Sequence, residues 1–230
     1  MAPSLAAKAA TQSIPIVFRL GTDPVALGLV ASLNRPAGNL TGVAGLSAEI
    51  VPKRLALLHE VVPAIASIAM LVNPGNPSAV QAETKDLQSA AHVLGVRVLV
   101  LNGGSESDIA AAFATLAEQQ VSALLISADT FFNAARHQII SLAARYAIPT
   151  MFSNRAYVAA GGLLSYGGDG SGRSRQVGLY AGRILKGEKP ADLPVVQPTK
   201  FELAINLKTA KTLGLTIPET LLATADEVIQ

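Results

Sequence analysis

Cysteine is absent from this chain of 230 residues. Its absence excludes a disulfide framework, a thiolate nucleophile and a cysteine-ligated zinc site. Charged residues are also few, at 15% of the chain, and the formal net charge at pH 7 is only +2. Lysine and arginine form no run, and aromatic residues do not alternate with basic ones, so the sequence predicts no nucleic-acid partner.

Long apolar runs are missing as well. Prolines or charges interrupt every apolar stretch before it reaches the ~18 residues that a membrane-spanning helix needs. The first ten residues, MAPSLAAKAA, lack the basic start and apolar centre of a secretion signal. We therefore expect no direct insertion into a membrane, and we identify no signal peptide in this chain.

Motifs for cofactor, metal and catalytic sites are also lacking. The glycine-rich stretch 167–172 has the wrong spacing for a dinucleotide fingerprint, with Arg173 where the third glycine belongs. Glu188 stands where a phosphate loop after Gly182 needs lysine, and no G-x-S-x-G nucleophile motif occurs. None of the three histidines has metal-site or triad spacing. We expect no cofactor, no metal and no catalytic residue. The histidines are His59, His92 and His137.

Half of the residues are apolar, and between Ser67 and Phe152 they follow a regular pattern. A short apolar run ends in a polar turn, a helix-period segment follows, and the pattern then repeats. Near-continuous apolar strands that alternate with helices are typical of βαβ units, in which a parallel sheet is buried on both faces. The expected strands are 67–72, 97–101, 122–126 and 148–152, and the helices between them end near residues 94, 119 and 146.

The flanking segments predict further elements of the same kind. Before the repeats we expect helices at 4–11, 25–33 and 47–60 and strands at 14–18 and 40–44. After them we expect a short helix at 155–159, a strand at 163–166, a long helix at 173–186 and an extended strap at 187–199. The chain should close with a strand at 201–206, a short helix at 207–213 and a helical tail at 217–230.

Function is expected at the polar turns, because parallel sheets bind ligands outside the carboxyl ends of their strands. One interpretation is that Asp23, Asn76 and Asp129 only cap the helices that follow them. The other is that the turns converge on a ligand: helix N-termini attract a carboxylate, while Asp129 or Asp169 holds an ammonium group. Such a mixture suits an amino acid. The candidate ligand-binding residues are Thr22, Asp23, Asn73, Asn76, Asp129, Thr130, Asn154, Tyr166 and Asp169.

Several longer runs resemble one family, the ABC transporter substrate-binding proteins of the tryptophan/tyrosine-binding type. The match extends in one order over essentially the whole chain, which is more specific than any single motif. The runs are IPIVF at 14–18, GTDPV at 21–25, GLVASLNRPAGNLTG at 28–42, LVNPGNP at 71–77, GGLLSYG at 161–167, GRILKG at 182–187 and KFELAINLK at 200–208.

The resemblance implies an α/β type I periplasmic-binding-protein fold, with two doubly wound parallel-sheet lobes that close on a small solute. Residues 1–46 with 163–195 would form the first lobe, and 47–162 with 196–230 the second. By resemblance, Thr22 and Asp23 belong to the first lobe, and Tyr166 and Asp169 lie at the return crossing. The other candidates belong to the second lobe. The family further implies a periplasmic location, ABC permease subunits as partners and no catalysis.

Two departures from the family bear on these expectations. The turn 73–77 replaces a serine-rich turn of members that bind aromatic amino acids, so the solute is left open. Family members also carry a signal sequence and further strands before the equivalent of Ala2, so we expect an incomplete first lobe in an N-terminally truncated chain. Two rival functions stay open: an enzyme on a similar doubly wound scaffold, with Asp129 and Asp169 as its acid–base pair, and the effector-binding domain of a regulator.

Overall fold

The computed structural model describes residues 2–45, 50–197 and 200–230, and the chain divides into two compact units. Unit 1 is Met1–Ser47 with Gly168–Phe201, and unit 2 is Ala48–Gly167 with Glu202–Gln230. The two lobes were expected to change after residues 162 and 195, whereas the two units change after residues 167 and 201. The segment 163–167 belongs to unit 2 because its strand pairs with Thr150–Phe152. The segment 196–201 belongs to unit 1, where Val196 pairs with Val43.

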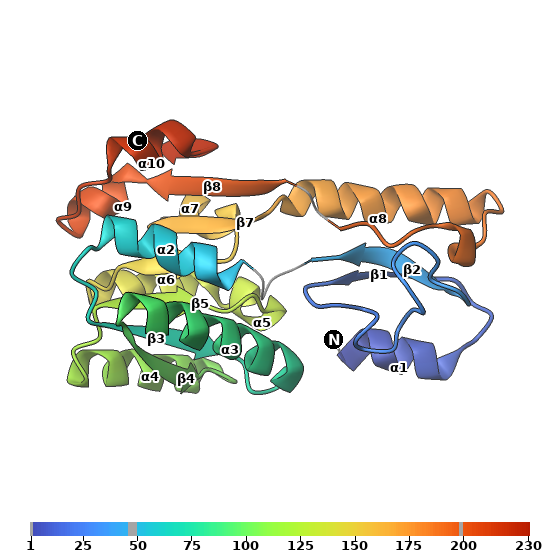
Figure 1. Cartoon of the computed structure of the whole chain (residues 1–230), viewed down its shortest axis with the longest axis horizontal. Helices are drawn as coiled ribbons and strands as arrows, with labels where there is room; N and C mark the ends of the chain where they lie inside the picture. Colours follow the sequence, from blue (N-terminus) through green and yellow to red (C-terminus); the bar gives the residue numbers. More distant parts are fainter. Residues whose placement is uncertain (1, 46–49, 198–199) are drawn as a thin grey trace. The chain divides into compact units, whose positions relative to one another are not determined.

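Unit 2 is built on one sheet, which has seven strands in the described part of the chain, in the order β4-β3-β5-β6-β7-β8-β9 (Figure 1). The pairs β3–β4, β3–β5, β5–β6, β6–β7 and β8–β9 are parallel, which confirms an α/β sheet in which parallel pairing dominates. The hydrogen bonds Asp169 N to Lys200 O and Asn206 N to Leu163 O show that β7 and β8 are antiparallel. The strands are β3 (Ser67–Val72), β4 (Arg97–Asn102), β5 (Ala123–Ile126), β6 (Thr150–Phe152), β7 (Leu164–Gly168), β8 (Phe201–Asn206) and β9 (Glu227–Ile229).

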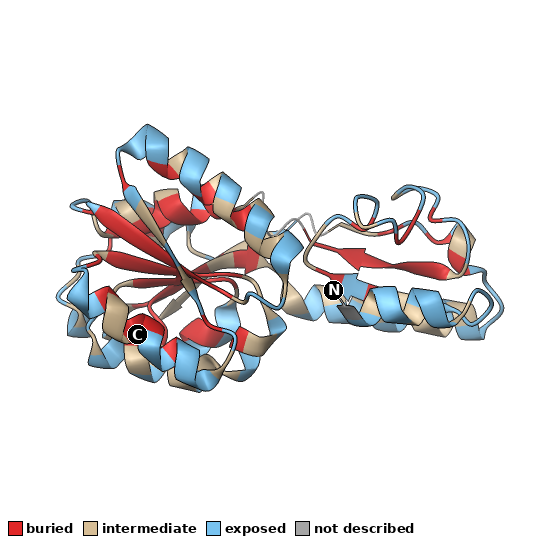
Figure 2. Ribbon diagram, turned by 90° about the horizontal axis from the view of Figure 1, so that it is seen from below, coloured by how far each residue is buried: buried red, intermediate tan, exposed pale blue. Residues whose placement is uncertain are grey.

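Helices cover both faces of this sheet (Figure 2). Strands β3, β5 and β6 are buried throughout, whereas the edge strands β4 and β9 are partly or largely exposed. Alternate residues of β3 show the two faces: Ile68 and Met70 belong to one apolar cluster, and Ala69 and Leu71 to the other. Helices α2, α3, α9 and α10 supply the first cluster, and α4 to α7 the second. The helices are α2 (Val51–Val61), α3 (Pro77–Leu94), α4 (Glu106–Glu118), α5 (Thr130–Ala134), α6 (Arg136–Arg145), α7 (Arg155–Ala159), α9 (Leu207–Thr212) and α10 (Glu219–Thr224).

Unit 1 contains the parallel strands β1 (Ile16–Leu20) and β2 (Leu40–Ala44) in its described part. Helix α8 (Gly170–Leu185) packs against both strands. Phe18 and Leu20 point into an apolar cluster with Leu29 and Val30. Helix α1 (Ala2–Ala10) precedes β1. A 3-10 turn, η1 (Pro190–Asp192), lies within the segment 187–199 for which the sequence predicts an extended strap.

Three expected helices are wrong in form. The segment 25–33 makes turns, because Gly28 adopts a left-handed conformation with φ +64° and its N–H closes a turn onto Val25 O. The helix expected from residue 130 to 146 breaks at Ala135 into α5 and α6. The tail 217–230 holds α10 and then the edge strand β9.

A substitution at Gly42 tests the close approach of strands β1 and β2, because Gly42 pairs with Phe18. A Cβ at this position would overlap the carbonyl oxygen of Phe18, whereas no described atom lies within 4 Å of a Cβ added at Gly178 in α8. Gly42→Ala should therefore destabilise the protein by about 3 kcal/mol, and Gly178→Ala should stabilise it by about 0.5–1 kcal/mol. Chemical denaturation measures both changes, and equal stabilities of the two variants would contradict the close strand pairing.

Candidate functional site

The candidate site of unit 2 lies where its strand order reverses. Strand β4 lies on one side of β3 and β5 lies on the other, so the turns after β3 and β5 leave a topological switch point. Open α/β sheets bind their ligands at such a point, beyond the carboxyl ends of the strands. Asn73 follows β3 directly and Asp129 follows β5. The structure thus places these two predicted residues at the edge where ligand binding is expected.

Asp129 is the centre of a hydrogen-bonded cluster. Asn73 Nδ2 donates to Asp129 Oδ1 at 3.0 Å, and Asn76 Nδ2 donates to Asp129 Oδ2 at 3.4 Å. The backbone N–H of Phe131 donates to Oδ1 at 2.8 Å, so Asp129 also caps helix α5. The half-buried carboxylate accepts only neutral donors among these contacts. These hydrogen bonds therefore orient the carboxylate group of Asp129, and no salt bridge in the described part of the chain pairs it with a cation.

Asn76 does not play the capping role that its place before Pro77 predicts. It precedes α3, but its side chain makes no hydrogen bond to that helix. Its amide nitrogen donates to Asp129 instead, and its buried Oδ1 has no hydrogen-bond partner among the described atoms. The capping interpretation is thus wrong for Asn76, while Asp129 both caps a helix and collects side-chain donors.

Two buried ionisable side chains, Glu83 and Arg54, bond to segments near this edge of the sheet. Glu83 of α3 is 2% exposed, and its Oε2 accepts the N–H of Ala128, the residue before Asp129, at 3.4 Å. Arg54 of α2 is 1% exposed; its Nε donates to Tyr166 O at 2.8 Å and its Nη2 to Ser153 O at 3.4 Å. Arg54 therefore connects α2 to the residue after β6 and to the middle of β7.

Burial raises the pKa of Glu83 from its ordinary value of 4.5 to about 7. The charge of Arg54 and the hydrogen bond from Ala128 oppose this rise, and the nearby charges of Asp129 and Asp86 add to it. Because the carboxyl group is buried and close to another carboxylate, its protonated form is favoured well above the usual range.

This pKa predicts a pH dependence of stability. Between about pH 4.5 and 7 the folded chain keeps the Glu83 proton that the unfolded chain releases, so the contribution of Glu83 to folding weakens as pH rises. The loss over this range is about 3 kcal/mol. Glu83→Gln has no such proton, so the stability of the wild type relative to this variant should fall between about pH 4.5 and pH 7.

Urea denaturation across this pH range measures the effect. Glu60→Gln is the matched control, because Glu60 is an exposed glutamate on the neighbouring helix α2. Its stability should follow that of the wild type at every pH. Parallel curves for Glu83→Gln and the wild type would contradict the raised pKa.

The other predicted residues of unit 2 lie at neighbouring strand ends but outside the Asp129 hydrogen bonds. Thr130 is the exposed first residue of α5. Asn154 caps α7 by accepting the N–H of Ala156 at 3.1 Å, and its Nδ2 donates to Asn133 Oδ1 at 2.8 Å. Tyr166 lies in β7 and its carbonyl accepts from Arg54.

Three predicted residues belong to unit 1. Thr22 is half-buried, and exposed Asp23 accepts the N–H of Val25 at 2.8 Å, within a turn rather than at the start of a helix. Asp169 caps α8: its Oδ1 accepts from Ser171 N and Ser171 Oγ at 2.8 and 2.6 Å, and its Oδ2 accepts from Gly172 N at 3.0 Å. These hydrogen bonds, chiefly that from the Ser171 side chain, lower the pKa of Asp169.

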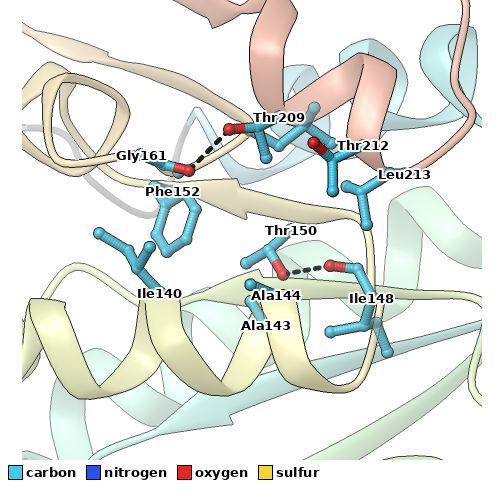
Figure 3. A pocket seen from close by; sticks show the side chains of 12 residues that line it. Ile140, Ala143, Ala144, Ile148, Thr150, Phe152, Gly161, Thr209, Thr212 and Leu213 are labelled. Atoms are coloured by element: carbon cyan, nitrogen blue, oxygen red, sulfur yellow. Dashed lines mark hydrogen bonds between the residues drawn. The ribbon is translucent and has the colours of Figure 1, made fainter.

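An apolar pocket lies elsewhere in unit 2, between α6 and α9 (Figure 3). Its polar groups are already engaged, because Thr209 Oγ1 donates to Gly161 O and Thr150 Oγ1 to Ile148 O. Ile148 and Gly161 precede β6 and β7, so the pocket is near the amino ends of these strands, away from the Asp129 turn. It offers no charged group to a polar solute. Likewise, the described residues contain no group of three or more His, Cys, Asp or Glu that could hold a metal ion.

Sequence reasoning missed Arg54 and Glu83, although a signal was present. Glu83 shares its helix face with Leu87 and Ala91, at a spacing of four residues. Arg54 falls between Val51 and Leu58 on the buried face of α2. A charged residue on the apolar stripe of an amphipathic helix is expected to be buried, and buried charges of this kind often mark a functional region.

In the described part of the chain, no helix has the length and apolarity to cross a membrane. A curated relative, the tyrosine-binding protein of Clostridioides difficile, is 27% identical over 210 residues, which are 91% of this chain and 60% of that protein. The chain therefore spans less than two thirds of the length of this relative.

Solved structures and a family model agree with this relationship. A conserved domain protein from Vibrio cholerae is 32% identical, and an ABC domain in complex with L-Trp from Streptococcus pneumonia is 28% identical. Each superposes with a TM-score of 0.87 over 98% of this chain and 75% of its own, which confirms the type I periplasmic-binding-protein fold. The family model described as ABC transporter substrate binding protein matches residues 2–229. The chain belongs to the ABC transporter substrate-binding protein family.

Proposed function

We propose that this protein is the solute-binding component of an ABC importer and that it captures an amino acid for delivery to the permease. The observation that carries this proposal is the carboxylate of Asp129, which two asparagine amides orient at the switch point of a parallel sheet. Periplasmic location and contact with ABC permease subunits follow from the family and are part of the proposal.

Asp129 is the group that we assign to the ammonium of the solute. Both of its oxygens are held by side-chain amides, and none of its hydrogen bonds comes from a cation. Asp169 is less suited to this role, because both of its oxygens are engaged in the first turn of α8. Thr130, Asn154 and Tyr166 are proposed as further contacts from unit 2, and Thr22 and Asp23 as contacts from unit 1.

An aromatic amino acid is the solute that we propose. The curated relative is a tyrosine-binding protein, and one similar structure is an ABC domain in complex with L-Trp. Asparagine and aspartate recognise the polar end that all amino acids share, so they do not select an aromatic side chain. The choice of an aromatic solute therefore rests on the relatives and not on the residues of the cluster.

Titration calorimetry with L-tyrosine, L-tryptophan, L-lysine and glucose tests the proposal. We expect saturable binding of one or both aromatic amino acids and weaker binding of L-lysine, because an apolar environment for the aromatic ring disfavours a second charge. Glucose lacks an ammonium group and should not bind. Binding of glucose but of no amino acid would contradict the proposal.

An enzyme is the rival function, and the raised pKa of Glu83 is the observation that favours it, since general acids and bases have pKa values near the working pH. The side chain of Glu83 is buried, however, and its carboxyl group bonds to the backbone of Ala128. We propose that it has a structural role. Recovery of the amino acid unchanged after prolonged incubation supports binding without catalysis, and conversion of the amino acid would establish the enzyme instead.

A further inference from the structure

Two arginine side chains in unit 1 lie side by side at the first turn of α8. Arg19 of β1 donates from Nη1 to Ser174 Oγ at 3.2 Å. Arg173 of α8 donates from Nε to Asp169 O and from Nη2 to Gly168 O, both at 3.3 Å. All three acceptors are neutral. In the part of the chain that the structure describes, the salt bridges are Arg155–Glu227 and Arg183–Glu188, so neither arginine takes part in one.

This pair is electrostatically unfavourable as it stands. Arg173 is half-buried, and burial followed by the charge of Arg19 lowers its pKa. The nearest carboxylate of opposite effect, that of Asp169, directs its oxygens to the N–H groups of the helix and not to the guanidinium groups. Two like charges held together at a polar edge are a common feature of binding sites, because a ligand of opposite charge relieves their repulsion.

Arg173 also lies at the edge where parallel sheets bind ligands. A Cβ added at Gly45, the residue after β2, would be only 3.2 Å from Arg173 Nη1, and the Gly45 N–H bonds to the last carbonyl of β1 at Leu20. The guanidinium group is therefore beside the carboxyl ends of β1 and β2. Arg19 reaches the same turn, since its Nη2 would be 3.8 Å from a Cβ at Gly170.

We propose that Arg19 and Arg173 form a carboxylate-binding site and that its ligand is the α-carboxylate of the amino acid solute. Guanidinium groups suit a carboxylate because their planar N–H donors match its two oxygens. The identity of the solute rests on the proposed function.

The test compares ligands with and without the carboxylate. L-Tryptophan and tryptamine differ in this group, and calorimetry gives the affinity of each for the wild type, Arg19→Gln and Arg173→Gln. Each variant should lose about tenfold or more in affinity for L-tryptophan and keep its affinity for tryptamine. Arg175→Gln is the control, because Arg175 is an exposed arginine two residues along α8. It should bind both ligands as the wild type does.

A second measurement keeps the site testable without any amino acid. Acetate, added at constant ionic strength, should saturably shift the NMR signals of the Arg19 and Arg173 Nε–H groups and not that of Arg175. Inorganic phosphate is titrated in parallel, and much tighter binding of phosphate than of acetate would overturn the assignment to a carboxylate. Circular dichroism spectra of the variants establish that they are folded.

The outcomes separate this inference from the proposed function. Loss of affinity restricted to L-tryptophan supports both. Equal losses for L-tryptophan and tryptamine, or no loss for either, leave the proposed function standing and overturn the arginine site. If no amino acid binds but acetate shifts both arginines, the anion site stands and the proposed function fails. If neither probe binds, both are overturned.

Discussion

Replacing Asp129 by alanine is expected to weaken the binding of L-tryptophan or L-tyrosine by about 2–5 kcal/mol, which is about thirtyfold or more in affinity. The physical reason is that the ammonium group of the solute loses its charged partner in a partly buried site. The same change frees the amides of Asn73 and Asn76, whose present acceptor is this carboxylate. Calorimetry on the purified variant measures the loss.

Asp129→Asn separates the charge from the shape of the side chain. The amide oxygen at position 129 can keep the hydrogen bonds from Phe131 N and Asn73. The new amide nitrogen can donate to Oδ1 of Asn76 after a flip of that side chain, since this oxygen is buried and has no partner among the described atoms. We therefore expect a stable fold together with a loss of binding close to that of the alanine variant.

Ser105→Ala is the matched control for the loss of a helix cap in the same unit. Ser105 caps α4, after β4, by accepting the N–H of Asp108 at 3.2 Å. Its removal should cost about 1 kcal/mol of stability and leave affinity unchanged. An Asp129→Asn variant with wild-type affinity would show that the charge of Asp129 takes no part in binding.

Arg54→Met is expected to destabilise the protein by about 3–5 kcal/mol at neutral pH. Methionine fills much of the space of the arginine stem, but it cannot donate to the carbonyls of Tyr166 and Ser153. It also removes the positive charge that lowers the pKa of Glu83, so the pKa of Glu83 should rise further. Urea denaturation measures the loss of stability.

The double variant Arg54→Met/Glu83→Gln tests whether the two charges act together. Replacing Glu83 by glutamine should restore part of the stability, because glutamine avoids the cost of protonating Glu83 at neutral pH, which the loss of Arg54 increases. Arg97→Met is the control, since Arg97 is an exposed arginine at the start of β4, and its stability should change by about 0.5 kcal/mol or less. Additive losses in the double variant would contradict the coupling.

Much of unit 2 could be predicted from the sequence because its local signals agree with one another. The strand 67–72 is apolar throughout and is buried throughout. The helix after it begins at Pro77 and ends at Leu94, where Gly95 takes the left-handed conformation that glycine favours. Unit 1 was harder to predict. The apolar residues near Val25 have a helical spacing, but the left-handed turn at Gly28 prevails over it.

The site could be predicted only in part, for a similar reason. The sequence pointed to Asn73 and Asp129 because each follows a predicted strand. Which of these turns lie next to each other depends on the order of the strands in the sheet, and only the structure shows that order. The role of Asn76 could not be read from its position, since its place before a helix favours a cap and its bond to Asp129 depends on the tertiary structure. Arg19 and Arg173 are 154 positions apart in the sequence, and only the packing of α8 on β1 brings them together.

The most direct test of the central claim, that the Asp129 cluster binds the solute, is an NMR titration that follows the side-chain amides of Asn73 and Asn76. Both amides donate to Asp129, so an ammonium group that binds this carboxylate must change their surroundings. We predict that L-tryptophan shifts both signals saturably, with the affinity that calorimetry gives, while the exposed side-chain amide of Asn102 at the end of β4 stays unchanged. Binding of L-tryptophan that leaves the Asn73 and Asn76 signals in place would contradict the account.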